Sequence, residues 1–530
     1  MNAPAQEGFA LPEPDEVRAE FSRRFARRPE SATDYLYQLG VDSGYIKLAA
    51  PERNICWESA SPWGPLELTI NCSKPEKDPR VIAAAAGRAG SDSAPSFPRR
   101  GGHSERSVAG LEGFSVTAPS LGTLPTTVAN KAAGLPQRPA RPASSFLPPS
   151  GTPQCDLCWE NEIWPGSPEH PAKPGLRVAA IALGGETWGL QYSPYGYFPE
   201  HCIALSTQHR PMAITAAAIR RLLDFADLFP FYFIGSNADL PIVGGSILSH
   251  DHFQGGRHTF PLMKAPLREE VPLPASPQVQ AGIVDWPAST LRLRSVNREQ
   301  LLAAAVRVLE VWEGFSFPPA SVLACGTDGE ERPVRHSTLN PIVHREGADY
   351  VLHLVLRNNR TDAAHPWGIF HPTEDLHHIK KENIGLIEIM GRAILPGRLA
   401  KELPAVQELL LEAAATGLSP EEVGRRATAN PLTAPHASWA ISIFSSGIPA
   451  SACDTPAPTR STALRRAEIL SLPNHPTPDR SLADGPSPLA PWMQDAVAAV
   501  FAQVLACTGV FKDDETGRAG WAAFLEKVSA

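Results

Sequence analysis

The hydrophobic and polar positions of this chain follow two different periods, which predicts helices mixed with short strands. Between Ile214 and Phe229 the apolar residues recur every three or four positions, with Arg and Asp opposite them, as on one face of a helix. Further helices are expected over residues 298–311, 380–394, 406–416, 420–426 and 492–507. Short apolar runs bounded by Gly and Pro predict strands over residues 66–73, 177–183, 188–195, 201–207 and 350–358. Because these elements interleave without a regular strand–helix–strand rhythm, the expected fold class is α+β with antiparallel sheets.

Two stretches lack such periodicity and divide the chain. Residues 84–151 consist largely of Ala, Gly, Ser, Pro and Arg, a composition that cannot bury enough apolar surface to offset the entropy of ordering, so we expect a disordered insertion. A second Pro/Ser-rich stretch covers residues 445–491 and is interpreted as a linker. The remaining divisions are an N-terminal region (residues 1–83), a half with the catalytic motif (152–270), a second half (271–444) and a C-terminal helical segment (492–530).

Composition and charge exclude several classes of protein. The 530 residues are 43% hydrophobic, which allows sizeable cores, and the net charge is −8 without any long Lys/Arg run, which argues against a nucleic-acid partner. The first residues lack the basic and apolar segments of a secretory signal, and no apolar run reaches the roughly 18–20 residues of a membrane span. We therefore expect a cytoplasmic enzyme that acts on small molecules.

The motif GGSILSHDHFQGG at residues 244–256 carries the strongest chemical signal. On an extended strand, His250, His252 and Gln254 would share one face. An imidazole on a Gly-flanked strand can attack phosphorus, while backbone N–H groups stabilise the phosphoryl oxygens. An H-x-H pair alone also fits structural histidines or a surface metal pair, so the Gly-Gly-Ser sequence and the Gln decide for catalysis. No Gly-rich dinucleotide or P-loop pattern is present.

This motif resembles the nucleophile sequence of the galactose-1-phosphate uridylyltransferase branch of the histidine-triad superfamily, and the run from Phe231 to Gly256 resembles its second class. Segments such as YLYQLGVDSGYIK, CDLCWENE and LHHIKKENIGLIEIMG are also similar to that class, and the similarity extends from Tyr35 to Phe524. The resemblance implies two related histidine-triad-like α+β halves.

The resemblance also implies a reaction. His252 would take the uridylyl group from UDP-glucose and pass it to galactose 1-phosphate, in a ping-pong cycle of galactose metabolism. Gln254 would donate its amide hydrogens to the phosphoryl oxygens. The residues expected to hold the substrates are Asn237, Gly244, Gly245, Ser246, Arg357 and Lys381. The family's helix Glu falls one residue away here, because Ile387 occupies its position and Glu388 follows.

The resemblance places a structural zinc at Cys155, Cys158, His209 and His250, and two thiolates with two imidazoles suit tetrahedral Zn²⁺. The alternative interpretation is a reduced CxxC at a turn. A second metal site of the family is incomplete, since Val355 replaces a ligand near His353, and we do not expect it. No organic cofactor is expected, and a homodimer fits the family, whose sites are often completed across a subunit interface.

Two other functions remain open from the sequence. One is a nucleotide phosphorylase or adenylyltransferase of the same superfamily, using the same His. The other is a non-catalytic protein that binds a nucleotide sugar, against which the intact His252 and Gln254 count.

Overall fold

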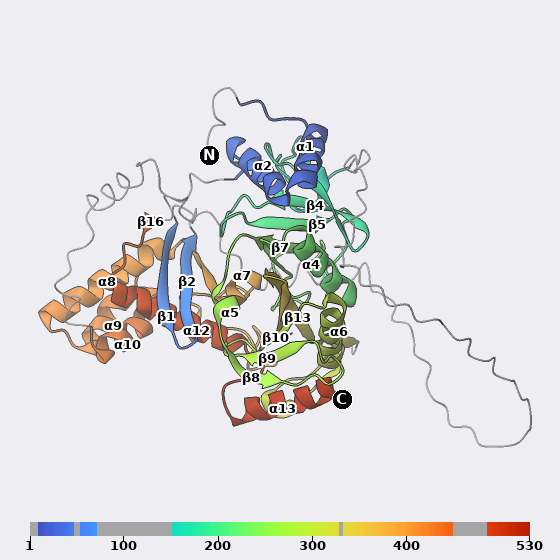
Figure 1. Ribbon diagram of the computed structural model, residues 1–530. Coiled ribbons are helices and arrows are strands. Elements are labelled where there is room, and N and C mark those ends of the chain that lie inside the picture. Colours follow the sequence, from blue (N-terminus) through green and yellow to red (C-terminus); the bar gives the residue numbers. More distant parts are fainter. Residues whose placement is uncertain (1–8, 47–53, 72–150, 328–331, 449–484) are drawn as a thin grey trace, which may run out of the picture.

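The computed structural model describes residues 9–46, 54–71, 151–327, 332–448 and 485–530 (Figure 1). Helices combine with sheets in which most neighbouring strands are antiparallel, which confirms the expected α+β class. The insertion expected at residues 84–151 lies outside the described residues except for Gly151. Most of the expected linker, residues 449–484, also lies outside them.

A ten-stranded antiparallel sheet forms the body of the molecule. Its first five strands in sequence are β3 (Ala179–Leu183), β4 (Glu186–Tyr192), β5 (Cys202–Ser206), β6 (Phe233–Gly235) and β7 (His252–Gly256), with helix α4 (Ala216–Leu228) between β5 and β6. The next five are β8 (Leu267–Val271), β9 (Gln280–Val284), β10 (Thr290–Ser295), β13 (Ser337–Glu346) and β14 (Asp349–Asn358), with α6 (Arg298–Gly314) after β10. A separate hairpin pairs β11 (Cys325–Thr327) with β12 (Pro333–Arg335).

The two sets of five strands have the same topology. In space the sheet runs β3-β4-β5-β7-β6 and then β13-β14-β10-β9-β8, so each half follows the same order from its outer edge to the centre. The halves meet where β6 pairs with β13, with Gly235 opposite Ile342. Each half also carries one long helix before its last two main-sheet strands. The repeat places the change of half between β7 and β8, whereas the expected boundary at residue 270 falls inside β8.

Helix α4 shows how the apolar stripe becomes structure. Thr215 caps its N-terminus, because its side chain accepts a hydrogen bond from the N–H of Ala218 at 3.2 Å. Ile219, Leu222 and Leu223 of the predicted stripe are fully buried in the core of the body. Further along the chain, α6 lies beside α4 against the sheet, and α13 (Glu515–Ser529) packs near α6 (Figure 1).

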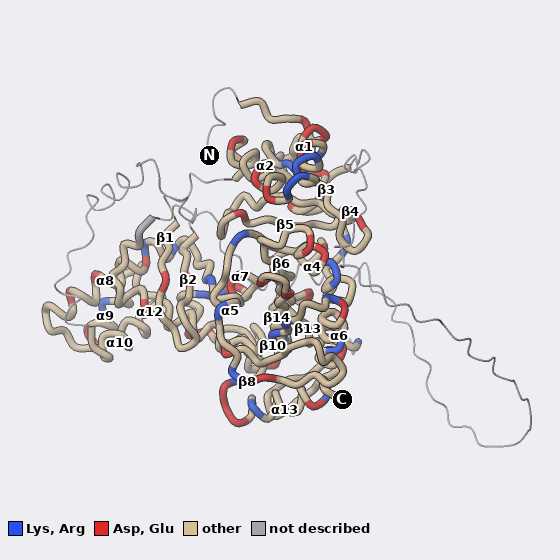
Figure 2. Tube along the Cα trace, in the orientation of Figure 1, with Lys and Arg blue, Asp and Glu red and all other residues tan. Residues whose placement is uncertain are grey.

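The N-terminal residues divide between two parts of the molecule. Helices α1 (Pro14–Arg27) and α2 (Pro29–Asp42) pack near β3 and β4, and α1 begins with acidic and ends with basic residues, which complements its dipole (Figure 2). The following hairpin belongs to a second lobe with a four-stranded sheet ordered β15-β2-β1-β16. Its strands are β1 (Ile55–Ser61), β2 (Gly64–Asn71), β15 (Arg392–Pro396) and β16 (Gly485–Pro486), and its helices are α8 (Leu399–Thr416), α9 (Pro420–Ala429), α10 (Ala437–Ser446) and α12 (Pro491–Thr508).

The helix expected over residues 380–394 is wrong. Only one turn, α7 (Leu386–Ile389), is helical, and the chain then enters β15, which pairs in parallel with β2. Gly391 separates them with φ of 102°, a left-handed conformation that a helix cannot continue through. The remaining short elements are α5 (Pro261–Lys264) and the 3₁₀ turns Trp159–Glu162, Pro318–Ala320, Glu374–Leu376 and Ala434–His436.

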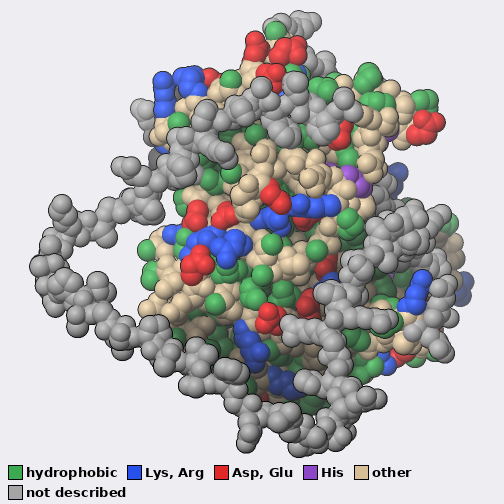
Figure 3. Space-filling view, turned by 90° about the vertical axis from the view of Figure 1, so that its right-hand side faces the viewer, with side chains coloured by type: hydrophobic (Ala, Val, Ile, Leu, Met, Phe, Trp, Pro, Cys, Tyr) green, Lys and Arg blue, Asp and Glu red, His purple; other side chains and the backbone are tan. Residues whose placement is uncertain are grey.

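Charged side chains of both signs are interspersed on the face shown in Figure 3, with no extended patch of one sign. None of the helices in the described ranges combines the length and apolar character needed to cross a bilayer.

Candidate active site

Most of the predicted catalytic and substrate-binding residues line one cavity of about 440 Å³. The segment before β7 and β7 itself contribute Asn237, Gly244, Gly245, Ser246, His252 and Gln254. Residues between 382 and 388, including Glu382, Gly385 and Glu388, also line the cavity. Within the described residues, a single chain therefore brings the motif together with the segment around α7.

His252 is the first residue of β7 and is 6% exposed. Its Nδ1 lies 2.8 Å from the carbonyl oxygen of His250. Because a carbonyl oxygen can only accept, Nδ1 carries the proton and donates, which leaves the lone pair on Nε2. Burial lowers the pKa of His252 to about 4, against the opposing effect of the hydrogen bond to the His250 backbone. Phe253 points to the opposite face and stacks on Trp188 with ring centroids 5.0 Å apart, which fixes the strand from behind.

Gln254 lies on the same face of β7 as His252, and both line the cavity. Its Oε1 accepts a hydrogen bond from Nε2 of His201 at 3.1 Å. The other ring nitrogen of His201 is buried without a hydrogen-bond partner in the described structure, which fits a neutral ring protonated at Nε2. Burial lowers the pKa of His201 to about 4, which also favours the neutral ring. With Oε1 occupied, the amide N–H groups of Gln254 remain available as donors.

Close backbone packing explains the glycines before the motif. A Cβ on Gly245 would lie 2.7 Å from Nδ2 of Asn237, and one on Gly244 would lie 2.5 Å from the carbonyl oxygen of Ala238. Asn237 is itself anchored, since its Oδ1 accepts a hydrogen bond from the N–H of Leu386 at 2.8 Å. Asn237 therefore ties the segment before the motif to α7, which also lines the cavity.

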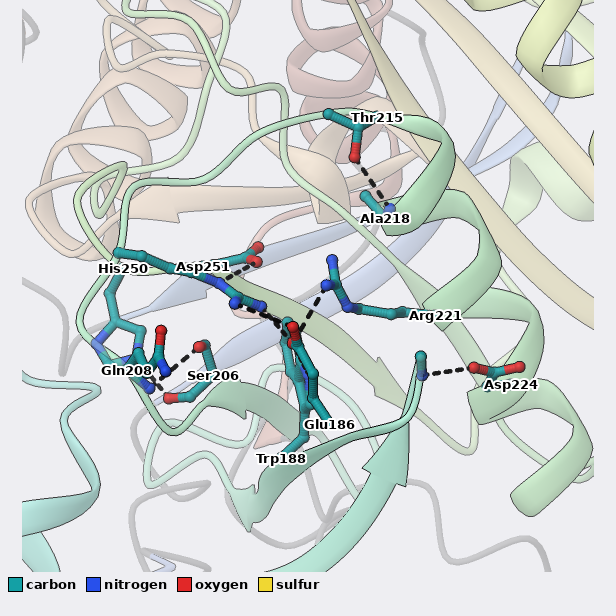
Figure 4. Close-up of polar contacts among 12 residues, drawn as sticks. Glu186, Trp188, Ser206, Gln208, Thr215, Ala218, Arg221, Asp224, His250 and Asp251 are labelled. Carbon is teal, nitrogen blue, oxygen red and sulfur yellow. Dashed lines mark hydrogen bonds and ion pairs between the residues drawn. The ribbon is translucent and has the colours of Figure 1, made fainter. Parts of the chain in front are cut away.

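His250 does not share the cavity with the other two motif residues, contrary to the prediction of a common face. It precedes the first residue of β7, so the alternation of the strand does not reach it. Its ring instead approaches Cys155, Cys158 and His209. Figure 4 shows the ring of His250 beside Ser206, with the carboxylate of Asp251 turned away from it.

The four predicted metal ligands converge. Their ligand atoms all lie within 4.8 Å of one another. The two sulfurs are 3.7 Å apart, and Nδ1 of His250 and Nδ1 of His209 each lie 3.3 Å from a sulfur, of Cys155 and Cys158 respectively. Tetrahedral Zn²⁺ with Zn–S bonds of about 2.3 Å separates its sulfurs by about 3.8 Å. The four side chains therefore fit a tetrahedral metal ion.

Neighbouring groups prepare these side chains for a metal. Nε2 of His250 donates to the carbonyl oxygen of Ser206 at 2.9 Å, so Nδ1 is left unprotonated toward the thiols. Hydrogen bonds from Cys155, His250 and His209 lower the pKa of Cys158, whereas the contact between the two thiols and burial raise the pKa of Cys155. The pair thus shares one proton, which a metal ion would displace on binding both sulfurs.

Two predicted substrate contacts lie outside the cavity. Arg357 is 1% exposed and donates to Oδ1 of Asn340 and to the carbonyl oxygen of Ile384, at 2.8 and 3.1 Å. Ile384 immediately precedes the cavity residue Gly385, so Arg357 supports the cavity wall from behind. Lys381 places its ammonium over the ring of Trp367, 5.1 Å from the centroid.

The cavity wall contains charged residues that the sequence analysis did not assign. Lys380 is fully buried, and its Nζ lies 2.9 Å from Oε2 of Glu382 and 2.5 Å from Oε1 of Glu388. Burial alone would lower the pKa of Lys380, but Glu388 and Glu382 raise it above its ordinary value. Both carboxylates line the cavity, so the ammonium holds two hydrogen-bond acceptors at its edge. The sequence signal for this network was the presence of Lys and Glu in the otherwise apolar run KKENIGLIE, because charges buried with such a run require partners.

His353 occupies β14, the strand that corresponds to β7 in the second half. It is fully buried, and its Nε2 accepts a hydrogen bond from Nε of Arg292 at 2.8 Å. His336, which precedes β13, pairs its Nδ1 with Oδ1 of Asn359 at 2.9 Å. Both histidines therefore use a ring nitrogen within the protein.

Comparison with known proteins places the chain among characterised relatives. The family model described as galactose-1-phosphate uridyl transferase, N-terminal domain, matches residues 2–211, and the model of its C-terminal domain matches residues 226–440. The chain is 38% identical over 520 residues to galactose-1-phosphate uridylyltransferase 2 of Streptococcus pneumoniae serotype 4, covering 98% of this chain and 83% of the relative. Identity is also 38% over 517 residues with galactose-1-phosphate uridylyltransferase of Lactiplantibacillus plantarum, covering 98% of this chain and 82% of the relative. A solved structure of yeast Ap4A phosphorylase aligns at a TM-score of 0.24 and 12% identity, over 40% of this chain and 64% of that chain, which is too low to carry an argument.

Proposed function

The chain belongs to the galactose-1-phosphate uridylyltransferase family, and we propose that it transfers a uridylyl group from UDP-glucose to galactose 1-phosphate through a covalent bond to His252. The observation that carries this proposal is the hydrogen bond from Nδ1 of His252 to the His250 carbonyl, which directs the lone pair to Nε2 in a residue that lines the cavity. The named activity of the relatives supports the choice of substrates.

In the first step, Nε2 of His252 attacks the phosphorus nearer uridine. A P–N bond forms, the bond to the bridging oxygen breaks, and glucose 1-phosphate leaves. In the second step, a phosphate oxygen of galactose 1-phosphate attacks the same phosphorus, the P–N bond breaks, and UDP-galactose forms. The amide of Gln254 donates to the non-bridging phosphoryl oxygens in both steps. Gln has no acidic proton to give and no basic group to activate water, which favours transfer over hydrolysis.

Residues around the cavity would hold the two substrates. Asn237, Gly244, Gly245 and Ser246 line the cavity. Their side chains and N–H groups would contact the diphosphate. The carboxylates of Glu382 and Glu388 are suited to accept hydrogen bonds from the hexose hydroxyls. Arg357 would act indirectly, by supporting the wall near Ile384.

We also propose that Cys155, Cys158, His209 and His250 hold a zinc ion. Thiolate and imidazole ligands favour zinc, and a set with four protein ligands indicates a structural role. The ion would fix the backbone at His250, whose carbonyl oxygen sets the tautomer of His252. The zinc would thereby stabilise the geometry of the motif without contacting the substrate.

An assay that compares two acceptors tests the proposed reaction. The purified protein is mixed with UDP-glucose and either galactose 1-phosphate or orthophosphate, and products are separated by chromatography. We expect UDP-galactose and glucose 1-phosphate with the sugar phosphate, and no uridine diphosphate from orthophosphate. Uridine diphosphate formation would instead identify a nucleotide phosphorylase, and the absence of any product would favour a binding protein.

A further inference from the structure

A second cavity of about 740 Å³ lies beyond the end of β7, separate from the one at His252. Arg257 and His258, which follow β7, contribute to it, together with Lys264 after the next turn. The ends of β13 and the start of β15 add His344, Arg345 and Arg392. Cationic side chains from several elements therefore converge on one hollow.

The carboxylate in the wall of this cavity is already neutralised. Oε2 of Glu67 lies 2.8 Å from Nε2 of His258 and 2.9 Å from Nη1 of Arg392. These contacts lower the pKa of Glu67 against the effect of its burial. The other lining carboxylate, Glu58, is exposed. The carboxylates that approach the other cations, Glu200 near Arg257 and Asp227 near Arg345, do not line the cavity.

Three lining cations keep hydrogen-bonding capacity. Arg345 lies over the ring of Tyr350, 3.6 Å from its centroid, and its Nε and Nη1 are buried with no hydrogen-bond partner in the described structure. Oδ1 of Asp227 is 3.8 Å from Nη1, too far for a hydrogen bond.

The other two cations are more accessible. Arg257 uses Nε for Glu200 at 2.8 Å, and its side chain is 41% exposed. Its guanidinium also lies over the ring of Phe231, 4.8 Å from the centroid. Lys264 is exposed and forms no ion pair with any carboxylate of the described ranges. Arginine forks and a lysine ammonium together match the oxygens of a dianionic phosphate.

We propose that this cavity binds a small molecule that carries a phosphomonoester group. Arg257, Lys264 and Arg345 would contact the phosphate oxygens. Phe231, Pro199 and Pro230 provide apolar surface for the remainder of the ligand. The site is distinct from the cavity at His252 and does not depend on the proposed transfer reaction.

Isothermal titration calorimetry, in which inorganic phosphate is added to the protein, tests this site. Wild-type protein should bind phosphate, and Arg345→Met and Arg257→Met should each weaken this binding about tenfold, or about 1.4 kcal/mol. Lys264→Gln should weaken it about threefold, and because this side chain is exposed the variant should fold normally by circular dichroism. Gln254→Ala, a change in the cavity at His252, should leave the phosphate affinity of the second cavity unchanged.

Arg425→Met on α9, where the side chain is 75% exposed, is the matched control for loss of one positive charge. Unchanged phosphate affinity in all three cavity variants would overturn the proposal. An equal loss in Arg425→Met would also overturn it, since the binding would then depend on net charge alone.

Discussion

The hydrogen bond that His252 donates to its neighbour two residues earlier determines which nitrogen can attack phosphorus. The same strand presents Gln254, and His201 on the adjacent loop fixes the orientation of that amide. In the proposed mechanism, each reacting group is therefore oriented by a second group that does not contact the substrate.

A double-mutant comparison tests the pairing of His201 with Gln254. Gln254→Ala should lower kcat about 100-fold, because a donor to the phosphoryl oxygens is lost. His201→Phe should lower kcat about tenfold with little change in KM, because the amide remains but is no longer oriented. In the Gln254→Ala background, His201→Phe should cause no further loss. Additive losses, measured by steady-state kinetics, would show that His201 acts independently.

Single residues also show what the sequence could predict. The alternation in the motif was sufficient to place His252 and Gln254 together, because both lie on a regular strand. The role of His201 depends on the pairing of β5 with β7, which no local pattern specifies. Arg357 was predicted at the substrate because it closes a strand, where a guanidinium could face a sugar phosphate. The structure instead buries it, with hydrogen bonds to the Ile384 carbonyl and to Asn340.

At the scale of elements, two connections hold the active site in place. The Cys155–Cys158 turn packs its thiols against His250, two residues before β7, and the segment between Lys380 and β15 forms part of the cavity wall. A periodic pattern predicted a helix for that segment. Pairing of β15 with β2, from a distant part of the chain, determined the strand instead.

The metal site gives a prediction for the first connection. Cys158→Ser should remove the bound zinc, measured by mass spectrometry of the purified protein, and lower the free energy of unfolding by about 3 kcal/mol or more. Cys325→Ser is the matched control, because Cys325 is exposed and lies outside the ligand set. One zinc per chain retained in Cys158→Ser would exclude the assigned ligands.

Gly391 gives a prediction for the second connection. A Cβ at this position would lie 2.8 Å from Cβ of Pro261 and 2.9 Å from the ring of Trp286, and φ is 102°. Gly391→Ala should therefore destabilise the protein by about 2–4 kcal/mol in urea unfolding. Gly417→Ala has a similar left-handed φ of 65° but open space, and should cost only about 1 kcal/mol. Equal costs for the two variants would refute the packing argument.

The whole molecule consists of two halves with one topology and a lobe built from both ends of the chain. In the half that contains β7, His252 lines a cavity. In the other half, Nε2 of His353 already accepts a hydrogen bond from Arg292. The sequence predicted two halves through its family resemblance. It could not predict the lobe, because β2 and β15 are separated by more than 300 residues and associate only through long-range pairing.

Buried histidines across the molecule predict a loss of stability in acid. Burial lowers the pKa of His201 and His371 to about 4 and that of His378 to about 3. The unfolded chain protonates these rings near pH 6.5, but the folded protein does not. Their contribution is therefore complete above about pH 6.5 and is lost as the pH falls toward 4.

Urea unfolding at several pH values measures this effect. The free energy of unfolding should fall between pH 6.5 and 5, by up to about 1.4 kcal/mol per pH unit for each such histidine. His378→Gln should reduce the slope by about one proton. A free energy independent of pH in this range would contradict the predicted neutrality of these rings.

The central claim is that His252 becomes bonded to phosphorus during turnover. UDP-glucose labelled in the phosphate nearer uridine is incubated with the protein without acceptor, the reaction is quenched, and the protein is digested for peptide analysis. We predict an acid-labile, base-stable label on the peptide that contains His252, and no label in folded His252→Ala. Label that persists in His252→Ala, or that is absent from a wild-type protein producing UDP-galactose, would contradict the account.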